Sequence, residues 1–450
     1  MKNDITKLTA YEIGTLLSKK KIDPIILLEL FMENYKLATP NTRNAVCKEI
    51  KKEAFLEAEK SWKRQKSNNR LSHFDGIPSG WKDVIDIKNY PALGGSKLLN
   101  KLRKNLKVKD AAVVSNARKN GVIPLFKTST VEFAFGGLGV NSSVEYPKNA
   151  MMKNNYCPGG SSSGSAVAVF SNLVPLAVGT DTAGSIRIPS SWHSLVGFKP
   201  TFNNISTRGI LPLAKSYDTI GTICKSVQDT ILFYSILSNS KPTFFYYKKK
   251  YTIGVIEDFI VTDLKGNENT TYKNFLNQLT LEKFNLKKVK IPEFNFVNKV
   301  LEEQGGVVNY EAYNFWKDSI KKDIEIIDRN VLSRFQLGEK MSRKRFLNIK
   351  KLINNLKKNV YSYFEDIDYL LLPTLSIKPP LIKNVLNKEN YIAFNNKVLS
   401  NTRVANLFNL SAITIPINNG NWLSYTLLAP ENNDSSLLAI AQDIENITIK

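Results

Sequence analysis

The sequence predicts an α/β fold arranged as one large domain. The chain has 450 residues, of which 42% are hydrophobic, so it can bury a large core. Apolar runs typical of buried strands alternate with helical patterns from residue 76 to residue 240. The sequence shows no internal repeat and no linker long enough to separate two domains. Alternation of this kind is typical of layered α/β proteins.

The N-terminal half begins with helices and then changes to mixed elements. Residues 7–36 predict two helices, the second of which starts at a proline, and residues 48–66 predict a third. The following segments predict a strand entering a polar loop at 76–87, a helix at 110–121, a strand at 122–129, a helix at 165–172 and a strand at 173–181.

The C-terminal half continues the alternation around a helical stretch. We predict a helix at 224–240, a strand at 252–259, mostly helix over 265–365, a strand at 368–376, a helix followed by a strand at 401–417, and a closing helix at 435–447. The single domain, residues 1–450, thus divides into N-terminal helices at 1–70, a core at 71–240, a variable insert at 265–365 and the C-terminal part of the core at 366–450.

Composition excludes several classes of protein. The net charge is +23, but the lysines are scattered in a chain also rich in Asn and Ile, which favours a general compositional bias over a dedicated nucleic-acid surface. No apolar run approaches the roughly 20 residues of a membrane helix, and the N-terminus lacks a signal-peptide pattern. The three cysteines have no CxxC spacing. We therefore expect a soluble, cytoplasmic protein that does not act at a membrane and has no metal site and no cofactor.

Two Gly/Ser-rich loops at 158–201 carry the densest chemical signal. A phosphate-binding loop would need a terminal Lys-Ser/Thr pair, which is missing, and a flexible linker would not continue directly into apolar structure. The remaining interpretation is acyl transfer, in which a serine attacks a carbonyl beside backbone N–H donors. The chain has two histidines, His73 and His193, and no GxSxG motif is centred on Ser161 or on Ser185, so a lysine is the natural base.

Several motifs in a fixed order resemble the amidase signature family. The GGSSxGS loop stands at 159–165 and the GxDxxGSxRxP segment stands at 179–189. The upstream GxPxxxKD motif stands at 76–83. Residues 126–137 and 196–221 are similar to two further family segments. The resemblance covers most of the chain, weakly in 265–365. It implies a central twisted mixed β-sheet covered by helices on both sides.

The resemblance also implies the roles of individual residues. The family's catalytic lysine corresponds to Lys82, its bridging serine, which follows a cis peptide bond, to Ser161, and its nucleophile to Ser185. The oxyanion hole would consist of the backbone N–H groups of Thr182, Ala183, Gly184 and Ser185. Ala183, like Ser163, stands where many members have glycine, but each keeps its backbone N–H.

This assignment predicts an amidase with a Ser-Ser-Lys triad. Neutral Lys82 would take a proton from Ser161, which takes one from Ser185, and Ser185 would form an acyl-enzyme with a small amide, releasing ammonia or an amine. A homodimer is compatible with this activity. One alternative is the A subunit of a tRNA-dependent glutamyl- or aspartyl-tRNA amidotransferase, which would need partner subunits and tRNA. Another is a homologue that binds without catalysis. The variants GGSSSGS and GSIRIP favour the free-standing hydrolase.

Other polar and aromatic residues have more than one interpretation. Asp181 and Arg187 could orient the loop or contact substrate, and Asp83 should point away from its strand neighbour Lys82. Tyr310, Tyr313 and Trp316 share a helical face and could line the substrate cavity or belong to the core. We expect the cavity walls to come from residues 300–400.

Overall fold

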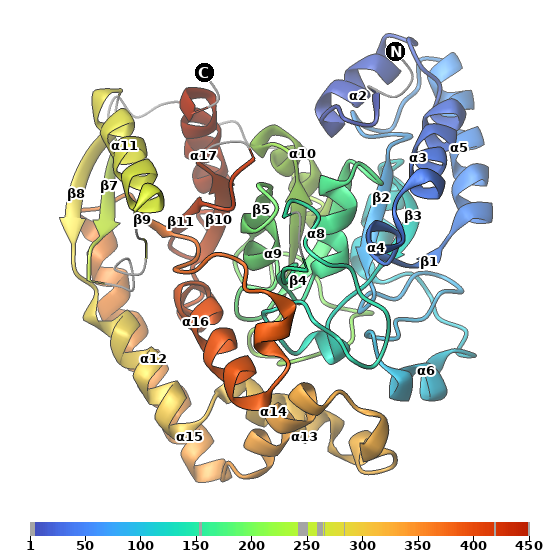
Figure 1. Cartoon of the computed structure of the whole chain (residues 1–450). Coiled ribbons are helices and arrows are strands. Elements are labelled where there is room, and N and C mark those ends of the chain that lie inside the picture. Colours follow the sequence, from blue (N-terminus) through green and yellow to red (C-terminus); the bar gives the residue numbers. More distant parts are fainter. Residues whose placement is uncertain are drawn as a thin grey trace.

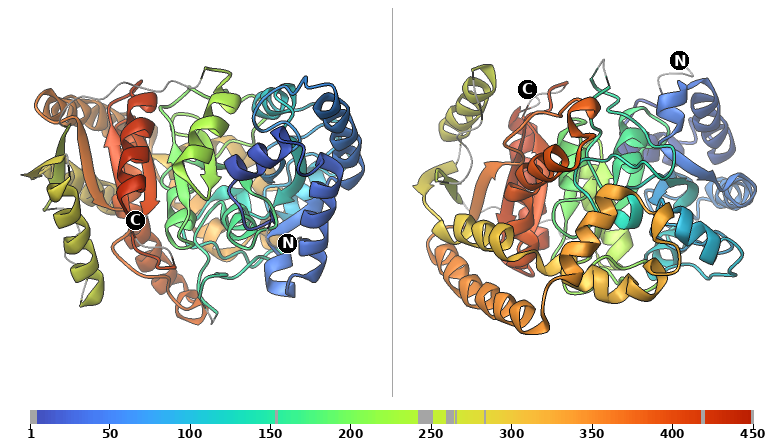
Figure 2. Two further views of the ribbon diagram at one scale, coloured as in Figure 1. Left: turned by 90° about the horizontal axis from the view of Figure 1, so that it is seen from above. Right: turned by 60° about the horizontal axis from the view of Figure 1, so that its bottom comes forward.

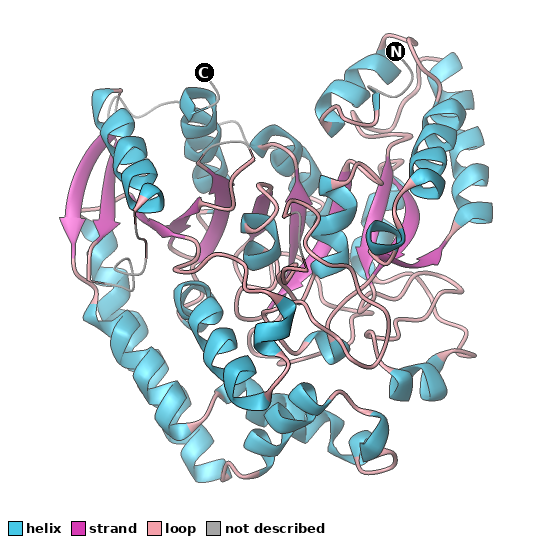
Figure 3. Ribbon diagram, viewed as in Figure 1, coloured by secondary structure: helices cyan, strands magenta, loops and turns pink. Residues whose placement is uncertain are grey.

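The fold is built on one mixed β-sheet that runs across the whole molecule (Figures 1 and 3). The computed structural model describes residues 5–152, 155–241, 251–258, 264, 266–282, 284–417 and 420–448. Within these residues the sheet has 11 strands in the order β1-β3-β2-β4-β6-β5-β10-β11-β9-β7-β8. The strands are β1 Val46–Glu49, β2 Pro78–Lys82, β3 Ile123–Thr128, β4 Leu176–Asp181, β5 Val196–Lys199, β6 Thr219–Cys224, β7 Tyr251–Ile256, β8 Phe284–Val289, β9 Tyr369–Pro373, β10 Ser411–Pro416 and β11 Ser424–Ala429.

Parallel and antiparallel pairs occur in both halves of the sheet. Strand β2 runs parallel to β3 and to β4, and β7 runs parallel to β8 and to β9. The pairs between them are antiparallel, from β4–β6 through β5, β10 and β11 to β9. The predicted α/β domain with a mixed sheet is therefore confirmed.

Helices cover both sides of the sheet and extend below it (Figure 2). The helices of the described residues are α2 Ala10–Ser18, α3 Pro24–Leu37, α4 Pro40–Arg43, α5 Lys51–Lys66, α6 Lys97–Arg103, α7 Ala112–Lys119, α8 Ser163–Phe170, α9 Arg187–Ser191, α10 Val227–Ser238, α11 Asn267–Leu281, α12 Pro292–Gln304, α13 Val307–Ile320, α14 Arg329–Glu339, α15 Arg343–Ser362, α16 Lys388–Leu407 and α17 Asp434–Thr448. Within them no helix combines the length and apolar character needed to cross a bilayer.

Local sequence explains where the first helices begin. Thr9 and Glu12 form a reciprocal capping box at the start of α2. Asp23 caps α3 and is followed by Pro24 in the first turn, where its missing N–H costs nothing. The helix predicted for 48–66 begins later than expected, at Lys51, because residues 46–49 pair with β3 as the edge strand β1.

The segment 265–365 contributes to the sheet as well as to the helical layer. Its helices α11 to α15 are present, but residues 284–289 form strand β8, which the sequence did not indicate. Helices α13 and α14 pack against residues 133–135 through the aromatic contacts of Phe133 with Trp316 and with Phe335. This apolar cluster attaches the helical layer to the loop region that carries the candidate site.

Candidate active site

Lys82 ends β2, which lies between two parallel neighbours, so its side chain emerges at the carboxyl edge of the sheet. The side chain is fully buried, and its Nζ lies 2.7 Å from Ser161 Oγ and 2.7 Å from Thr180 Oγ1. In the described part of the chain no carboxylate forms an ion pair with it. Burial lowers the Lys82 pKa from 10.5 to about 7, although the more distant Asp181 and Asp218 raise it. Lys82 is therefore available as a neutral amine near neutral pH.

Ser161 lies in the first Gly/Ser loop, immediately before α8. The Gly160–Ser161 peptide bond is cis, as the resemblance implied. The Ser161 carbonyl accepts hydrogen bonds from Thr130 Oγ1 at 2.9 Å and from the Val131 N–H at 3.3 Å. The Gly160 N–H donates to the Gly137 carbonyl at 2.8 Å. These contacts fix the Ser161 hydroxyl beside Lys82.

Glycine is required where α8 approaches the edge of the sheet. The Gly164 N–H donates to the Ser129 carbonyl at 3.0 Å. A Cβ at Gly164 would overlap the Ser129 backbone and the Ala45 carbonyl. The small residues of the loop therefore allow the helix to start close to β3 and to place the loop over the end of β2.

Ser185 lies in the turn between β4 and α9 and is 6% exposed. Its carbonyl accepts the Ser162 N–H at 3.1 Å, which joins the two Gly/Ser loops directly. Its hydroxyl has no hydrogen-bond partner among the described residues, so Ser161 and Ser185 Oγ are not hydrogen-bonded here. Catalytic hydrogen bonds commonly tighten only when substrate binds. The fold thus brings together all three residues that the motifs indicated.

The four backbone N–H groups expected to form the oxyanion hole are not all free to bind a substrate oxygen. The Gly184 N–H donates to Asp181 Oδ1 at 2.8 Å and is therefore already committed within the turn. The N–H groups of Thr182, Ala183 and Ser185 have no acceptor among the described residues. Three of the four predicted donors remain available to a substrate oxygen.

A fully buried ion pair between Arg187 and Asp181 stabilises the turn between β4 and α9. Arg187 Nη2 and Nε donate to the Asp181 carboxylate at 2.9 and 3.1 Å, and Asp181 also accepts the Ile186 N–H. Burial would raise the Asp181 pKa, but Arg187, Lys199 and the hydrogen bonds lower it to about 2. The pair therefore orients the loop, which was one of the two interpretations of these residues.

Helix α16 completes the support from the C-terminal half. Asn406 Nδ2 donates to the Asp181 carbonyl at 2.9 Å, and Asn406 Oδ1 accepts from Arg187 at 2.8 Å. Thr402 Oγ1 donates to the Ala183 carbonyl at 2.7 Å. A Cβ at Gly184, where φ is +126°, would overlap Thr402. The sequence motifs did not indicate these α16 residues, which lie more than 200 positions further along the chain.

Asp83 and His193, and also Asp218, have structural roles. Asp83 pairs with Lys127 at 2.8 Å, so it turns away from Lys82 as expected. Asp218 accepts from Thr182 Oγ1 at 2.6 Å and from two backbone N–H groups. His193 is buried, its Nδ1 faces the Pro189 carbonyl at 2.9 Å, and burial lowers its pKa to about 4. His193 is therefore a neutral core residue.

The aromatic residues of α13 belong to the helical layer. Tyr310 stacks on Phe346, and Tyr313 donates its hydroxyl hydrogen to Glu339. Trp316 packs against Phe133 and donates its Nε1–H to the Pro212 carbonyl at 2.9 Å. The helical spacing of these three aromatic residues therefore reflects their packing within the helical layer.

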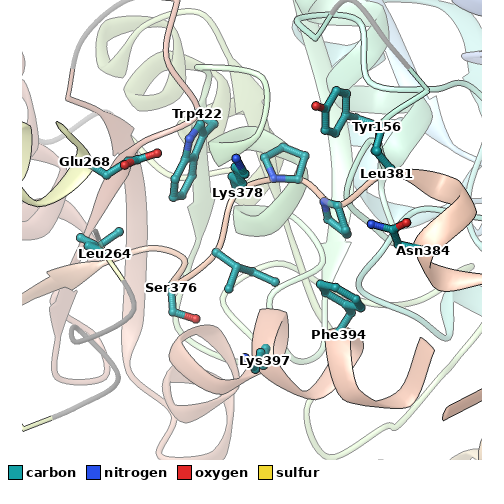
Figure 4. Close-up of a pocket in the computed structure, with 13 residues that line it drawn as sticks. Tyr156, Leu264, Glu268, Ser376, Lys378, Leu381, Asn384, Phe394, Lys397 and Trp422 are labelled. Carbon is teal, nitrogen blue, oxygen red and sulfur yellow. The ribbon is translucent and has the colours of Figure 1, made fainter. Parts of the chain in front are cut away.

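A cavity of about 620 Å³ lies beside the loop that follows β9. Figure 4 shows Trp422, Lys378 and Tyr156 among the side chains around it. The loop packs on the segment before Ser161, because the Cys157 N–H donates to the Pro380 carbonyl at 2.9 Å. The residues that line this cavity do not include Lys82, Ser161 or Ser185. Within the described chain no group of three or more His, Cys, Asp or Glu side chains could hold a metal ion.

The fold and the site together define a class of protein, namely an α/β protein that holds a buried lysine beside two serine-bearing Gly/Ser loops, an arrangement suited to acyl transfer. The Amidase family model matches residues 27–438, and the chain belongs to this family of amide-hydrolysing enzymes.

The similarity to known relatives extends over most of the chain. The chain is 29% identical over 378 residues to 2-amino-5-chloromuconic acid deaminase of Comamonas testosteroni, covering 82% of this chain and 81% of that protein. It is 28% identical over 417 residues to the A subunit of glutamyl-tRNA(Gln) amidotransferase of Clostridium botulinum, covering 83% of this chain and 84% of that protein. A crystal structure of an amidase superposes with a TM-score of 0.87 at 25% identity, covering 98% of this chain and 99% of that one.

Proposed function

We propose that the protein hydrolyses a small amide through an acyl-enzyme on Ser185, with Ser161 as relay and Lys82 as base. The observation that carries the proposal is the environment of Lys82. Its buried amine lies 2.7 Å from Ser161 Oγ and has no carboxylate partner among the described residues. A lysine that serves only structure would normally be paired with an acid or exposed to solvent.

The geometry supports a two-stage reaction. Ser185 Oγ attacks the amide carbonyl while its proton passes to Ser161 and the Ser161 proton passes to Lys82. The N–H groups of Thr182, Ala183 and Ser185 receive the developing oxyanion. The proton then returns from Lys82 through Ser161 to the leaving nitrogen, the C–N bond breaks, and water hydrolyses the ester on Ser185 by the same relay.

The second candidate function is the A subunit of a tRNA-dependent amidotransferase. It is favoured by the similarity to the Clostridium botulinum protein over 83% of the chain. In that case the same triad would release ammonia from glutamine for use by partner subunits. The loop variants at Ser163 and Ile188 favour the free-standing hydrolase.

Ammonia release from a panel of aliphatic and aryl amides that includes glutamine separates these functions. We expect wild type and the Ser67→Ala control, an exposed serine outside the site, to release ammonia equally, and Ser185→Ala to release none. Release from glutamine only when amidotransferase partner subunits and charged tRNA are added would instead support the second candidate. Equal background release by wild type and Ser185→Ala, with partners present, would refute catalysis by this site.

A further inference from the structure

Glu132 is a fully buried carboxylate next to the segment that contacts Ser161. Ser96 Oγ donates to its Oε1 at 2.7 Å, and Ser143 Oγ and the Asp328 N–H donate to its Oε2 at 3.1 and 2.6 Å. Within the described residues no lysine, arginine or histidine forms an ion pair with it. A buried charge is costly unless hydrogen bonds compensate it. This carboxylate therefore depends on donors from three separate segments of the chain, and it ties those segments together.

The Glu132 carboxylate is charged at the pH at which Lys82 is neutral. Burial raises the Glu132 pKa from 4.5 to about 6, and the nearby Asp328 carboxylate raises it as well. The hydrogen bonds from Ser96, from Ser143 and from the Asp328 N–H lower it. At pH 8 the group is therefore an ionised acceptor in all three hydrogen bonds.

The backbone that follows Glu132 has a conformation that is unusual for residues with a side chain. Phe133 and Ala134 have φ angles of +55° and +58°. Such a conformation persists only where the surrounding structure enforces it. The Phe133 N–H donates to the Gly94 carbonyl at 2.8 Å, and the Ala134 N–H donates to the Val131 carbonyl at 2.8 Å. These bonds and the side-chain contacts of Glu132 together hold the turn.

The residues directly before Glu132 orient Ser161. Thr130 Oγ1 and the Val131 N–H donate to the Ser161 carbonyl at 2.9 and 3.3 Å. Ser161 Oγ in turn lies 2.7 Å from Lys82 Nζ. A shift of the backbone at 130–132 would therefore be transmitted to the Ser161 peptide and to the distance between its hydroxyl and Lys82.

A second route connects the carboxylate to Thr130 across the loop. Asn141 Nδ2 donates to the Thr130 carbonyl at 3.1 Å. Asn141 Oδ1 accepts the Ser143 N–H at 2.9 Å, and the Ser143 hydroxyl donates to Glu132. Glu132 thus fixes Thr130 both along the chain and through the turn at 141–143.

The same turn is also joined to the end of β2. The Gly94 carbonyl accepts the Phe133 N–H, and the Gly94 N–H donates to the Asp83 carbonyl at 2.7 Å. Asp83 directly follows Lys82 in the chain. The turn at 132–134 therefore contacts the backbone beside both partners of the hydrogen bond between Ser161 and Lys82.

We propose that Glu132 is a positioning residue for the proton relay, which holds residues 130–131 so that Ser161 Oγ stays within hydrogen-bonding distance of Lys82. Glu132 contacts neither Ser161 nor Lys82 through its side chain, so it acts through the backbone that it fixes. This inference rests on the proposed function, since it concerns the relay serine of the same site.

The test compares two leaving groups on one acyl group at pH 8. The p-nitroanilide and the p-nitrophenyl ester are made from the acid whose amide wild type hydrolyses best, and kcat/KM is measured for each. The aniline nitrogen leaves only after it receives a proton through the relay, whereas nitrophenolate leaves without one. A displaced relay therefore lowers the anilide rate more than the ester rate. Unfolding of part of the sample lowers both rates equally and leaves their ratio unchanged.

We expect Glu132→Ala to lower the anilide-to-ester ratio by about tenfold or more, because a small misplacement of a proton-transfer group is costly. Glu132→Gln should keep the ratio within about threefold of wild type, because its amide oxygen still accepts the Asp328 N–H while its amide nitrogen donates to Ser96 Oγ. Glu132→Asp withdraws the carboxylate from these donors and should lower the ratio by at least about threefold, which provides a second measurement if Glu132→Ala does not fold.

The matched control is Asp229→Ala, which removes a buried carboxylate from α10. Asp229 accepts the N–H groups of Ala10 and Tyr11 at 3.2 and 2.8 Å and belongs to the packing of the N-terminal helix. We expect Asp229→Ala to lose stability while its anilide-to-ester ratio stays at the wild-type value. An equal fall of the ratio in Asp229→Ala and Glu132→Ala would overturn the inference, and so would a Glu132→Gln ratio as low as that of Glu132→Ala.

Ser161→Ala distinguishes failure of this inference from failure of the proposed function. Wild-type hydrolysis of the anilide by Ser161→Ala would show that Ser161 is not a relay, and the proposed function would fail. A large loss in Ser161→Ala together with a wild-type ratio in Glu132→Ala, or in Glu132→Asp where Glu132→Ala does not fold, would overturn only the positioning role of Glu132.

Discussion

Replacing Lys82 by methionine should abolish activity and change stability in a pH-dependent way. Methionine has a similar length but no charge, so it fills the same buried space without the desolvated amine. In wild type the Lys82 pKa is about 7 in the folded state and 10.5 ordinarily. The unfolded state therefore binds more protons between these values, and wild-type stability rises with pH across that window.

The magnitude follows from the two pKa values. The cost of burying Lys82 is about 5 kcal/mol at pH 6, where both states are protonated, and about 2 kcal/mol at pH 9, where the folded state is neutral. Loss of the hydrogen bonds to Ser161 and Thr180 costs about 1–3 kcal/mol each and does not depend on pH in this range. The stability of Lys82→Met relative to wild type should therefore be about 3 kcal/mol more favourable at pH 6 than at pH 9.

Thermal unfolding of both proteins at pH 6 and pH 9 measures this difference. For 450 residues, 3 kcal/mol corresponds to about 3 °C in the relative Tm. Lys344→Met, which removes an exposed lysine, provides the control and should differ from wild type equally at both pH values. A relative Tm of Lys82→Met that is the same at pH 6 and pH 9 would show that Lys82 titrates normally when folded, and it would refute the role of Lys82 as a neutral base.

Three further predictions concern the groups around the nucleophile. The kcat/KM for an amide should rise with pH through an apparent pKa of about 7, because the base must be neutral Lys82. Asp181→Asn should lower the free energy of unfolding by about 3–5 kcal/mol and remove activity, because it leaves a buried arginine unpaired. As a comparison, Asp323→Asn breaks the exposed ion pair with Lys101 and should lower the free energy of unfolding by less than about 1 kcal/mol. Thr402→Val should lower kcat about tenfold with little change in KM, because the Ala183 carbonyl loses its partner.

Each of these predictions has an outcome that contradicts it. A pH profile that is flat between pH 6 and pH 8 would exclude a base with a pKa near 7. Denaturant unfolding in which Asp181→Asn and Asp323→Asn lose equal stability would show that burial of the first pair is unimportant. A Thr402→Val enzyme with wild-type kcat would show that α16 does not position the turn.

The positions of the three residues proposed to react could be predicted because each lies in a short motif whose neighbours are also constrained. Lys82 ends a strand, and Ser161 and Ser185 lie in glycine-rich turns that need close backbone approach. Thr402 and Asn406 carry no such local signal. Their role arises from tertiary contacts across more than 200 residues, which a pattern in one segment cannot show.

The same distinction explains which strands were predicted. Strands β3, β4 and β9 are continuous buried runs, and their sequences indicate this directly. Strand β8 exposes Lys288 at the edge of the sheet, and its mixed pattern resembles the polar helices on either side. Strand β5 has four residues, which is too short for a periodicity to be recognised.

Helix α16 has a consequence for how this enzyme can evolve. The proposed reacting groups all precede residue 190, whereas the α16 residues that support their turn, Thr402 and Asn406, follow residue 400. Recombination between two homologous genes in the stretch between α10 and β7 would therefore combine the Gly/Ser loops of one parent with helix α16 of the other. The contacts of Thr402 and Asn406 with residues 181–183 form the junction that both parents would have to share.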